Sequence, residues 1–541
     1  MPGTNHTFPL IPKVIIGMMA LVLIAGHLSA KNQIFNVASN KQLFIDDQFV
    51  DFAVGVNWKV NPPQKAGPVL TPILETEGSY LATNSILTVN NQYWMYYTCY
   101  APTDWLERDW SGEVPGEARH MTCLAKSMDG IHWKRVQVNR YDIGRGMSNA
   151  IVMPCTGGTV FLDPNKTRGH RFWFIGNITE NPWWDESIGA IYKLLDNQGE
   201  KVGGAMYLCH SADGITWQRI KEPILPIWCD TQNQAFYDSY INRYVAYVRG
   251  RINKLRVVCR GESEQLDRLP WPYEIKPETE IGPGGLIPKM IHEEWPAVIK
   301  SDSLDPEYTD IYTPNVHIYP YAGSRVYLAF LPVYRRYKNF ESFGRDTRGE
   351  YKNDGPIEIQ LAVSRDGINW KRYHEPYIPL GRNNEMDGGC LYFGVGMIRQ
   401  GDDIWQYYTG SPWTHGSYPY QPELSNAIFR VVQRLDGFVS VNSSHNGGEI
   451  VTHPLIFEGN RLHLNIDCGA MGEAWVEIQD TSGIPIPNYH IDDCVSVDRN
   501  GITQEVWWKK GPDVGGLSGT PVRLRIKMRS SKLYALQFIT N

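Results

Sequence analysis

Short runs in which apolar and polar residues alternate recur along most of the chain, a pattern typical of half-buried β-strands. Five of these runs are rich in aromatic residues, and another apolar run precedes each of them. The aromatic runs lie at residues 93–97, 171–175, 243–247, 326–330 and 404–408, and the preceding runs at 81–89, 150–162, 234–237, 315–319 and 391–398. The pattern predicts an all-β protein.

A repeated turn follows the same order. The motif Ser-x-Asp-Gly-x-x-Trp occurs at residues 127–133, 211–217 and 364–370, each time between two predicted strands, and weaker copies centre on Asp267 and Asp436. Asp-Gly between strands indicates a hairpin turn. Five units of four antiparallel strands predict a five-bladed β-propeller over residues 31–441. The alternative is an irregular β-sandwich whose hairpins share a turn.

Beyond residue 441 the repeat ends. Strictly alternating runs at 461–466, 474–479, 522–528 and 533–538 lack the turn motif. Alternation of this kind on several strands is typical of two sheets packed face to face. We therefore expect a small C-terminal β-sandwich over residues 442–541, with a structural role.

The first 30 residues have the features of an export signal. Lys13 precedes an apolar run over residues 14–26, and small side chains follow it up to Ala30. The run is shorter than the roughly 20 apolar residues that span a membrane. We expect a signal peptide over residues 1–30, a secreted or periplasmic mature protein and no membrane association after cleavage. An uncleaved N-terminal anchor is the alternative.

Composition excludes several classes of protein. Of the 541 residues, 42% are hydrophobic and 20% charged, and the formal net charge is −6. This describes a soluble globular protein and gives no electrostatic reason to bind nucleic acid. The nine cysteines are an odd number without a Cys-x-x-Cys pair, which disfavours a disulfide framework and a zinc site. Cys468 and Cys494 are the one pair to test for a disulfide.

In a propeller the first strand of every blade lines a central channel, so residues at the strand entrances converge. The predicted entrances carry Glu75, Glu77, Arg145, Asn149, Asp230, Asn233, Asp310, Tyr312, Glu385 and Asp387. Carboxylates around one funnel suit glycoside hydrolysis, because one protonates the leaving oxygen while another activates water or attacks the sugar. Crowding raises the pKa of one carboxyl, which keeps it protonated as the acid. Turn capping is the alternative role for each acid.

The predicted loops and strand ends on the same rim add aromatic and basic side chains. Aromatic rings that would stack on sugars, or anchor the loops, are Trp105, Trp110, Trp183, Trp184, Trp413 and Tyr418. Guanidinium groups that would grip a carboxylate or sulfate, or remain solvated, are Arg249, Arg251, Arg335 and Arg336. His120, His317 and His415 follow no metal-binding spacing. We expect no metal site and no cofactor, leave a structural calcium open, and group His415 with the substrate-binding residues.

The repeated turns, the strand order and the trailing sandwich resemble the five-bladed propeller glycosidases of glycoside hydrolase families 32, 43 and 68. The segments 43–47, 158–163 and 434–440 also resemble secreted propeller proteins of polysaccharide-degrading bacteria. The resemblance implies a base or nucleophile, an acid that tunes the pKa of its neighbour and a general acid on successive blades. Because blade 2 offers Arg145 and Asn149 instead of an acid, the scheme would shift to blades 3, 4 and 5.

The leading hypothesis is a secreted glycoside hydrolase that acts on a plant or algal polysaccharide fragment, with an anionic glycan as one option. Asp230 would be the base or nucleophile, Glu385 the acid, Asp310 the carboxylate that tunes the pKa, and Asp387 the alternate. A non-catalytic glycan-binding propeller is the second hypothesis. The third is a glycoside phosphorylase in which the four arginines hold phosphate. The oligomeric state is not indicated by the sequence.

Overall fold

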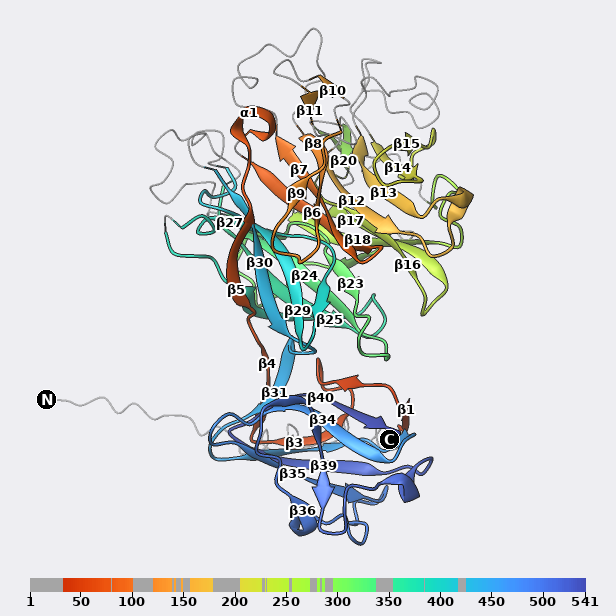
Figure 1. The fold of residues 1–541 in the computed structure, drawn as a ribbon, viewed down its shortest axis with the longest axis vertical. Coiled ribbons are helices and arrows are strands. Elements are labelled where there is room, and N and C mark those ends of the chain that lie inside the picture. Colours follow the sequence, from red (N-terminus) through yellow and green to blue (C-terminus); the bar gives the residue numbers. More distant parts are fainter. Residues whose placement is uncertain are drawn as a thin grey trace, which may run out of the picture. The chain divides into compact units, whose positions relative to one another are not determined.

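The computed structural model describes residues 33–78, 80–100, 120–138, 141–142, 147–148, 156–178, 205–225, 229, 231–252, 255–272, 280–282, 285–287, 295–336, 354–383, 385–416 and 425–541. The regular structure in these residues is β-strand, as the sequence pattern predicts, with one helical turn, α1 (Leu74–Glu77), and short 3₁₀ turns (Figure 1). The chain divides into two compact units. The larger unit is Trp58–Ser440, and residues 33–57 form the smaller unit together with Val441–Asn541.

The larger unit contains sets of antiparallel strands in sequence order. The first set is β6 (Leu81–Val89), β7 (Gln92–Tyr100), β8 (His120–Ser127) and β9 (Lys134–Arg135). The second is β12 (Thr156–Leu162), β13 (Phe172–Ile178), β14 (Ala205–Ser211) and β15 (Gln218–Arg219). The third is β16 (Gln234–Asp238), β17 (Arg243–Ile252), β18 (Leu255–Ser263) and β21 (Ala297–Ile299). Short separate pairs are β10 (Tyr141–Asp142) with β11 (Met147–Ser148) and β19 (Glu280–Gly282) with β20 (Gly285–Ile287).

The fourth and fifth sets have a first strand in two pieces. In the fourth, β22 (Thr309–Ile311) and β23 (Val316–Ile318) pair with β24 (Tyr327–Arg335), followed by β25 (Ile357–Ser364) and β26 (Trp370–Ile378). In the fifth, β27 (Cys390–Phe393) and β28 (Ile398–Gln400) pair with β29 (Asp403–Ser411), followed by β30 (Ala427–Arg434). The last strand of the fifth set is β5 (Gln64–Leu70), which comes from the beginning of the unit. One parallel pair, Ile357 with Cys390, joins these two sets into a sheet of 10 strands.

Hydrogen bonds link the first strand of each set to the first strand of the next. The bonds run from Val160 N to Ser85 Oγ (2.8 Å), Thr159 Oγ1 to Asn233 O (2.9 Å), Gln234 Nε2 to Val316 O (2.6 Å) and Asn315 Nδ2 to Phe393 O (2.7 Å). Val395, which follows β27, donates to Asn84 O (2.9 Å) and accepts from Ile86 N (2.7 Å). The series of contacts therefore returns from the fifth set to the first.

The three strong copies of the turn motif have one geometry. In the first copy the hydroxyl of Ser127 accepts from the backbone N–H of Gly130 (2.9 Å), and Asp129 Oδ1 accepts from the backbone N–H of Ile131 (2.9 Å). The copies at 211–217 and 364–370 repeat both bonds. The turn glycine has φ of 72°, 72° and 74° in the three copies, a conformation that favours glycine.

A tyrosine from a neighbouring set bonds each turn glycine. The hydroxyl groups of Tyr407, Tyr96 and Tyr247 donate to the carbonyl oxygens of Gly130 (2.6 Å), Gly214 (2.9 Å) and Gly367 (2.8 Å). The motif tryptophan packs edge-on to the same tyrosine, in the pairs Trp133–Tyr407, Trp217–Tyr96 and Trp370–Tyr247. Each strong copy of the turn motif therefore connects its set of strands to a neighbouring set by a hydrogen bond and an aromatic contact.

We expect Tyr407→Phe to lower the free energy of unfolding by about 1 kcal/mol, because the buried carbonyl of Gly130 loses its donor. Urea unfolding followed by intrinsic fluorescence measures this change. Tyr237→Phe is the matched control, since its hydroxyl makes an exposed bond to Asn242 and its loss should cost less than half as much. Equal effects of the two substitutions would contradict a role of the Tyr407 hydroxyl in joining the sets.

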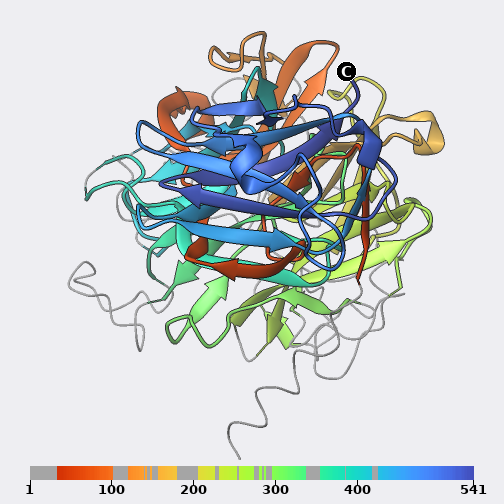
Figure 2. The ribbon, with the colours of Figure 1, turned by 90° about the horizontal axis from the view of Figure 1, so that it is seen from below.

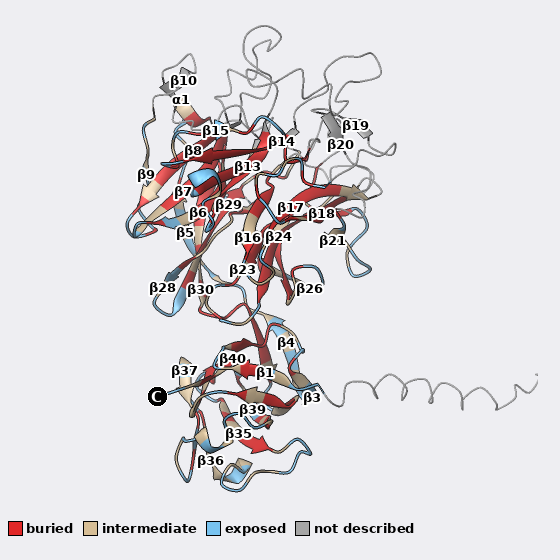
Figure 3. Ribbon diagram, turned by 90° about the vertical axis from the view of Figure 1, so that its right-hand side faces the viewer, coloured by how far each residue is buried: buried red, intermediate tan, exposed pale blue. Residues whose placement is uncertain are grey.

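The hydrophobic core of the larger unit lies between neighbouring sets, where the strands are buried (Figure 3). One cluster combines Tyr97 and Met95 of the first set with Tyr407 and Ile428 of the fifth. A second cluster combines residues of the third and fourth sets, and a third extends over the first, second and third sets. Apolar packing therefore follows the same order as the hydrogen bonds between first strands.

The smaller unit contains two main sheets. One has the order β37 (Gly501–Glu505), β34 (Arg461–Asp467), β40 (Lys532–Ile539), β31 (Val439–Ser443) and β4 (Val56–Val60), with β2 (Gln42–Leu43) on β40. The other has the order β3 (Val50–Val54), β32 (Gly448–Thr452), β39 (Arg523–Arg529) and β35 (Glu473–Gln479). Figure 2 shows the blue C-terminal strands of this unit running side by side. Burial alternates along β34, β35 and β39, as the sequence pattern predicts. Smaller pairs are β1 (Phe35–Ala38) with β33 (Leu455–Phe457) and β36 (Cys494–Val495) with β38 (Trp507–Trp508).

The boundary of the smaller unit differs from the sequence interpretation at one end. Val441 begins its C-terminal part, but residues 33–57, expected in the propeller, belong to it as well. The reason is strand pairing: β1 pairs with β33, β2 with β40, and β3 with β32. N-terminal strands thus pair with C-terminal strands in three places, and local sequence patterns do not reveal such long-range pairing.

Two further expectations concern the smaller unit and the chain's beginning. Cys468 and Cys494 are both thiols, and they bond different groups: the first donates to Val497 O (3.2 Å) and the second accepts from Val476 N (3.2 Å). The pair named for a disulfide test is therefore held as two separate thiols with different partners in this structure. The expected signal peptide, residues 1–30, lies outside the described residues. Among the described residues, no helix has the length and apolar character to cross a membrane.

Candidate functional site

Charged and aromatic side chains from the third, fourth and fifth sets meet around Tyr312, directly after β22. We call this group the Tyr312 cluster, and its members are Arg249, Arg256, Asp310, Tyr312, Tyr334, Arg336, Tyr392 and His415. They come from β17, β18, β22, β24 and β27 and from residues just beyond β22, β24 and β29. Three of the five sets thus contribute to one group.

Two arginines approach the ring of Tyr312. The guanidinium carbon of Arg249 lies 4.4 Å from the ring centroid and that of Arg256 lies 5.1 Å from it. Arg249 Nε also donates to the backbone oxygen of Tyr312 (3.0 Å), and its backbone N–H donates to Asn233 Oδ1 (2.9 Å). Cations over aromatic faces are attracted by the ring quadrupole. These contacts hold two positive charges beside a half-buried tyrosine.

Asp310 is the counter-charge of the cluster. Its Oδ1 accepts from the backbone N–H of Arg256 (2.7 Å), and its Oδ2 accepts from Arg256 Nη1 (2.7 Å) and Arg336 Nη2 (2.6 Å). The side chain is 0% exposed, against 6% for Arg256 and 11% for Arg336. Both carboxylate oxygens are therefore occupied by arginine donors. This arrangement orients two guanidinium groups rather than presenting a carboxyl to a substrate.

Aromatic rings form the other part of the cluster. His415 lies 5.0 Å from Tyr312 and 4.9 Å from Tyr334 between ring centroids, and its Nδ1 is 3.1 Å from the Tyr392 hydroxyl. Burial raises the pKa of Tyr334 against the opposing charges of Arg256 and Arg336, so its hydroxyl stays protonated at neutral pH. Half-buried Tyr312, Tyr392 and His415 leave part of their rings open to solvent.

The segment that carries His415 is fixed by a buried carboxylate. Asp354 Oδ1 accepts from the backbone N–H of Gly416 (2.8 Å), and Oδ2 accepts from the hydroxyl of Thr414 (3.1 Å). The backbone N–H of His415 donates to Gly355 O (3.0 Å). Asp354 is therefore a positioning residue for His415, and it was missed by the sequence analysis.

Asp387 and Glu385 lie in a separate group at the start of the fifth set. Asp387 is buried, and its Oδ2 accepts from Lys65 Nζ (2.6 Å) on β5 and from the Tyr408 hydroxyl (2.8 Å). Burial, followed by the charge of Asp387, raises the pKa of Tyr408, which therefore remains a donor. Glu385 is exposed, and its Oε2 accepts from the backbone N–H of Arg382 (2.7 Å). Among the described residues, no hydrogen bond joins this group to the Tyr312 cluster.

Both carboxylates approach the backbone of Gly381. A Cβ at this position would lie 2.0 Å from Asp387 Oδ1 and 2.8 Å from Glu385 Oε2. We expect Gly381→Ala to lower the free energy of unfolding by about 2 kcal/mol, because overpacking displaces Asp387 from Lys65. Differential scanning calorimetry measures the change, with Gly516→Ala as the control, since no atom lies within 4 Å of its Cβ. An equally small effect of both would show that the carboxylates can move freely.

The other predicted residues are in several separate environments. Glu77 is buried and accepts from Arg135 Nε (2.7 Å), Arg135 Nη2 (2.7 Å) and the Tyr97 hydroxyl (2.6 Å), which makes it a structural ion pair. Trp413 is buried, and Arg335 pairs with Glu358 (2.6 Å). His317 is buried apart from the cluster, with its Nε2 2.6 Å from Asn315 Oδ1. The predicted residues that lie outside the described part of the chain are Trp105, Trp110, Arg145, Asn149, Trp183, Trp184, Asp230 and Tyr418. The side chains of Glu75 and His120 are likewise not described.

Sequence reasoning missed several members of the Tyr312 cluster. Arg256 and Tyr334 lie inside buried strands, and Tyr392 lies on a first strand. The available signal was Arg256 itself, a charge inside an apolar strand that is buried in the fold and needs a partner. Its partner Asp310 is 54 positions away, which no local pattern indicates.

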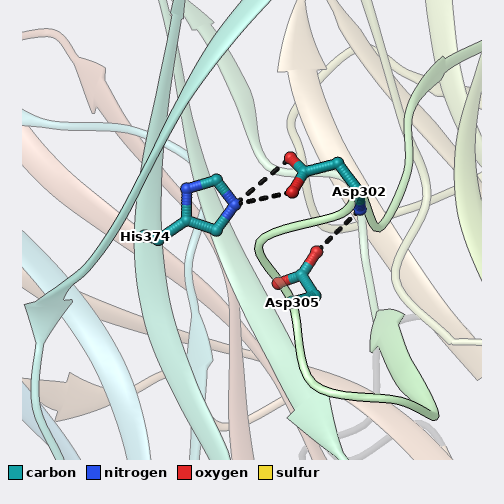
Figure 4. A group of neighbouring side chains, drawn as sticks. All are labelled: Asp302, Asp305 and His374. Carbon is teal, nitrogen blue, oxygen red and sulfur yellow. Dashed lines mark hydrogen bonds and ion pairs between the residues drawn. The ribbon is translucent and has the colours of Figure 1, made fainter. Parts of the chain in front are cut away.

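Asp302, Asp305 and His374 form a group whose potential ligand atoms lie within 4.8 Å of one another (Figure 4). Arg372 lies on the same strand as His374. Its Nη2 bonds Asp305 and lies 3.1 Å from Asp302 Oδ2 and 2.9 Å from His374 Nε2. Burial raises the pKa of Asp302, but the Leu304 N–H and the charge of Arg372 outweigh it, so the pKa falls. A guanidinium already balances these carboxylates, and the residues do not fit a metal ion while it stays there.

Comparisons with known proteins give only distant similarity. No protein-family model and no curated protein sequence matches the chain. Solved structures similar to it include a glycoside hydrolase with TM-score 0.41 and 13% identity over 69% of this chain and 92% of that one. A glycosyl hydrolase from Bacteroides ovatus has TM-score 0.39 and 12% identity over 73% and 97%. The family 32 β-fructofuranosidase of Bombyx mori has TM-score 0.36 and 10% identity over 92% and 96%.

The similar solved structures thus include glycoside hydrolases. TM-scores of this size do not decide the activity of this chain, so its function has to be argued from the arrangement of its own residues.

Proposed function

We propose that the larger unit is a five-bladed β-propeller and that the protein is a secreted or periplasmic glycoside hydrolase acting on an anionic plant or algal polysaccharide or oligosaccharide. The smaller unit would be a β-sandwich. The observation that carries the proposal is the Tyr312 cluster, where guanidinium groups and half-exposed aromatic rings from three sets of strands meet.

The propeller is supported by the order of contacts in the larger unit. Each first strand bonds the next, Val395 returns to Asn84 and Ile86 of the first set, and the N-terminal strand β5 completes the fifth set. A propeller whose last blade contains a strand from the chain's beginning is held closed by that pairing. First strands would then surround one axis, with the Tyr312 cluster at the ends of three of them.

The substrate class is supported by the chemistry of the cluster. Sugar rings stack their C–H faces on aromatic side chains, and guanidinium groups bind carboxylate or sulfate through paired hydrogen bonds. Tyr312, Tyr392 and His415 supply the rings, while Arg249 supplies the positive charge, because Arg256 is already paired with Asp310. A uronate or sulfated sugar satisfies both kinds of group.

The proposed chemistry uses carboxylates in separate roles. Asp230 is the proposed base or nucleophile and Glu385 the proposed acid, with Asp387 as its alternate. Asp310 would tune and orient its surroundings, a role supported by its contacts with two arginines. A carboxyl separation of about 5–5.5 Å would give retention at the sugar carbon and about 6.5–9.5 Å inversion. No cofactor is proposed.

The test is turnover of purified full-length protein on matched uronate-containing, sulfated and neutral oligosaccharides. Asp230→Asn and Glu385→Gln should each lower kcat at least a hundredfold, because each removes a proton-transferring carboxyl. Asp402→Asn, an exposed acid in a turn, is the control and should turn over normally. Unchanged kcat in both Asp230→Asn and Glu385→Gln would reject the acid and base roles of these two residues. Binding without turnover of any substrate would favour a glycan-binding propeller instead.

A glycoside phosphorylase is the second candidate, favoured by the arginines of the cluster, since guanidinium groups also bind phosphate. The same substrates incubated with inorganic phosphate distinguish the two. Release of a sugar phosphate at a rate proportional to phosphate concentration would identify phosphorolysis, whereas release of free sugar without phosphate would identify hydrolysis.

We expect Arg249→Gln to raise KM about tenfold for a uronate-containing substrate and to leave KM for the neutral analogue unchanged. The reason is the loss of a charged hydrogen-bond donor to the anionic group, worth about 1.4 kcal/mol at this ratio. Steady-state kinetics on the matched pair measures the effect, with exposed Arg268→Gln as the control. A parallel rise in both KM values would show that Arg249 serves the fold rather than anion recognition.

A further inference from the structure

Two cysteines in the first set of strands place their sulfur atoms in contact. Cys99 on β7 and Cys123 on β8 have their Sγ atoms 3.5 Å apart. The side chains are 0% and 1% exposed and belong to the same hydrophobic cluster. Cys99 lies opposite Met121 and Cys123 opposite Tyr97, so the cysteines are diagonal neighbours on one face of the antiparallel pair.

We propose that Cys99 and Cys123 form a disulfide when the chain folds under oxidising conditions. Both side chains project from the same face of adjacent strands, and the two sulfur atoms need to approach by only about 1.5 Å to reach bonding distance. Both residues are free cysteines, so a bond between them needs no existing bridge to be broken. The proposal is independent of the catalytic function proposed above.

The reaction is thiol–disulfide exchange with a small or protein disulfide as oxidant. One cysteine thiolate attacks a sulfur of the oxidant and releases one oxidant thiol. The second cysteine thiolate then attacks the mixed disulfide and releases the other. Each cysteine loses its proton, the S–S bond of the oxidant breaks, a new S–S bond forms in the protein, and two electrons pass to the oxidant.

The bond should form while the strands assemble rather than afterwards. The hydrogen bond with Cys123 and burial raise the pKa of Cys99 well above its ordinary value. Because the thiolate is the reacting species and the folded pair is shielded from solvent, oxidants react slowly with the folded dithiol. Oxidation during refolding and oxidation of the folded protein are therefore expected to give different results.

The positions of the two cysteines in the sequence determine which segment of the chain the bond would close into a loop. Residues 100–122 lie between the two cysteines, and this segment contains Trp105 and Trp110, which the sequence analysis assigned to sugar binding. A disulfide across the base of a segment reduces the conformational entropy of the unfolded chain. The oxidised protein should therefore unfold at a temperature a few degrees higher than the reduced protein.

The experiment refolds the full chain from denaturant in a glutathione and glutathione disulfide buffer, then alkylates it in denaturant without reductant. We expect an intact mass about 2 Da below that of the reduced chain before alkylation, and a cross-linked Cys99–Cys123 peptide in the peptide map after it. Folded reduced protein given the same buffer for the same time should stay unlinked.

Controls separate this pair from other thiols. Cys99→Ser should abolish the cross-linked peptide, whereas Cys259→Ser should retain it. If either variant does not refold, the peptide map of the wild-type chain still identifies the linked residues. Alkylation of both Cys99 and Cys123 after oxidative refolding, or a link from either to another cysteine, would overturn the proposal.

Discussion

Asp310→Asn is expected to lower the free energy of unfolding of the larger unit by about 3–5 kcal/mol. The substitution keeps the size of the side chain but removes the negative charge that Arg256 and Arg336 share. Two nearly buried guanidinium groups would then face each other without this counter-charge, and removing one partner of a buried ion pair carries a penalty of this size. Urea unfolding followed by fluorescence measures the change.

The chain offers a matched control beside Arg336. Arg335 pairs with Glu358, but its side chain is 39% exposed, so water screens the pair. Glu358→Gln should therefore cost about 0–1 kcal/mol. If Asp310→Asn and Glu358→Gln unfold at the same urea concentration, Asp310 does not act as the buried counter-charge of the cluster.

His317 is expected to make the protein less stable in mild acid, by about 2 kcal/mol between pH 7.5 and pH 5. Burial lowers the pKa of His317 from 6.5 to about 3. In the folded state the ring stays neutral over this range, while in the unfolded state it takes up a proton below pH 6.5. The unfolded state thus binds more protons, and stability is lost as the pH falls from 6.5 toward 3.

His317→Gln should reduce this pH dependence by the same amount, although it lowers stability at pH 7.5. Unfolding curves at pH 7.5, 6 and 5 measure the slope for both proteins. The window ends at pH 5 because carboxyl groups titrate below it. His445→Gln, at an exposed turn position, should leave the slope unchanged. An identical slope in wild type and His317→Gln would mean that the buried ring is not the titrating group.

The turn motif shows what local sequence predicts well. Ser127, Asp129 and Gly130 are within four positions of one another, and their hydrogen bonds form inside the turn itself. Such geometry depends on side-chain reach and on the φ that glycine allows. The all-β class is confirmed for the same reason, since alternation of side chains is a property of each strand.

The site shows what local patterns leave open. Asp387 was selected as an acid before a first strand, and the structure adds a partner, Lys65, 322 positions away. Glu77 was selected by the same argument and forms an ion pair with Arg135, which is 58 positions away. An acid at a strand entrance looks the same in the sequence whether it meets a substrate or an internal cation, so the two uses cannot be separated without the fold.

The sequence by itself determined the all-β class, most strands of the repeated units and the positions of the tight Asp-Gly turns. Tertiary structure decided that β5 completes the fifth set, that residues 33–57 join the C-terminal sheets, and that Asp310 is held between Arg256 and Arg336. The physical reason is the distance along the chain between the residues that interact. Strand alternation and turn bonds depend on neighbouring residues, whereas pairing and charge compensation depend on which distant segments the packed fold brings together.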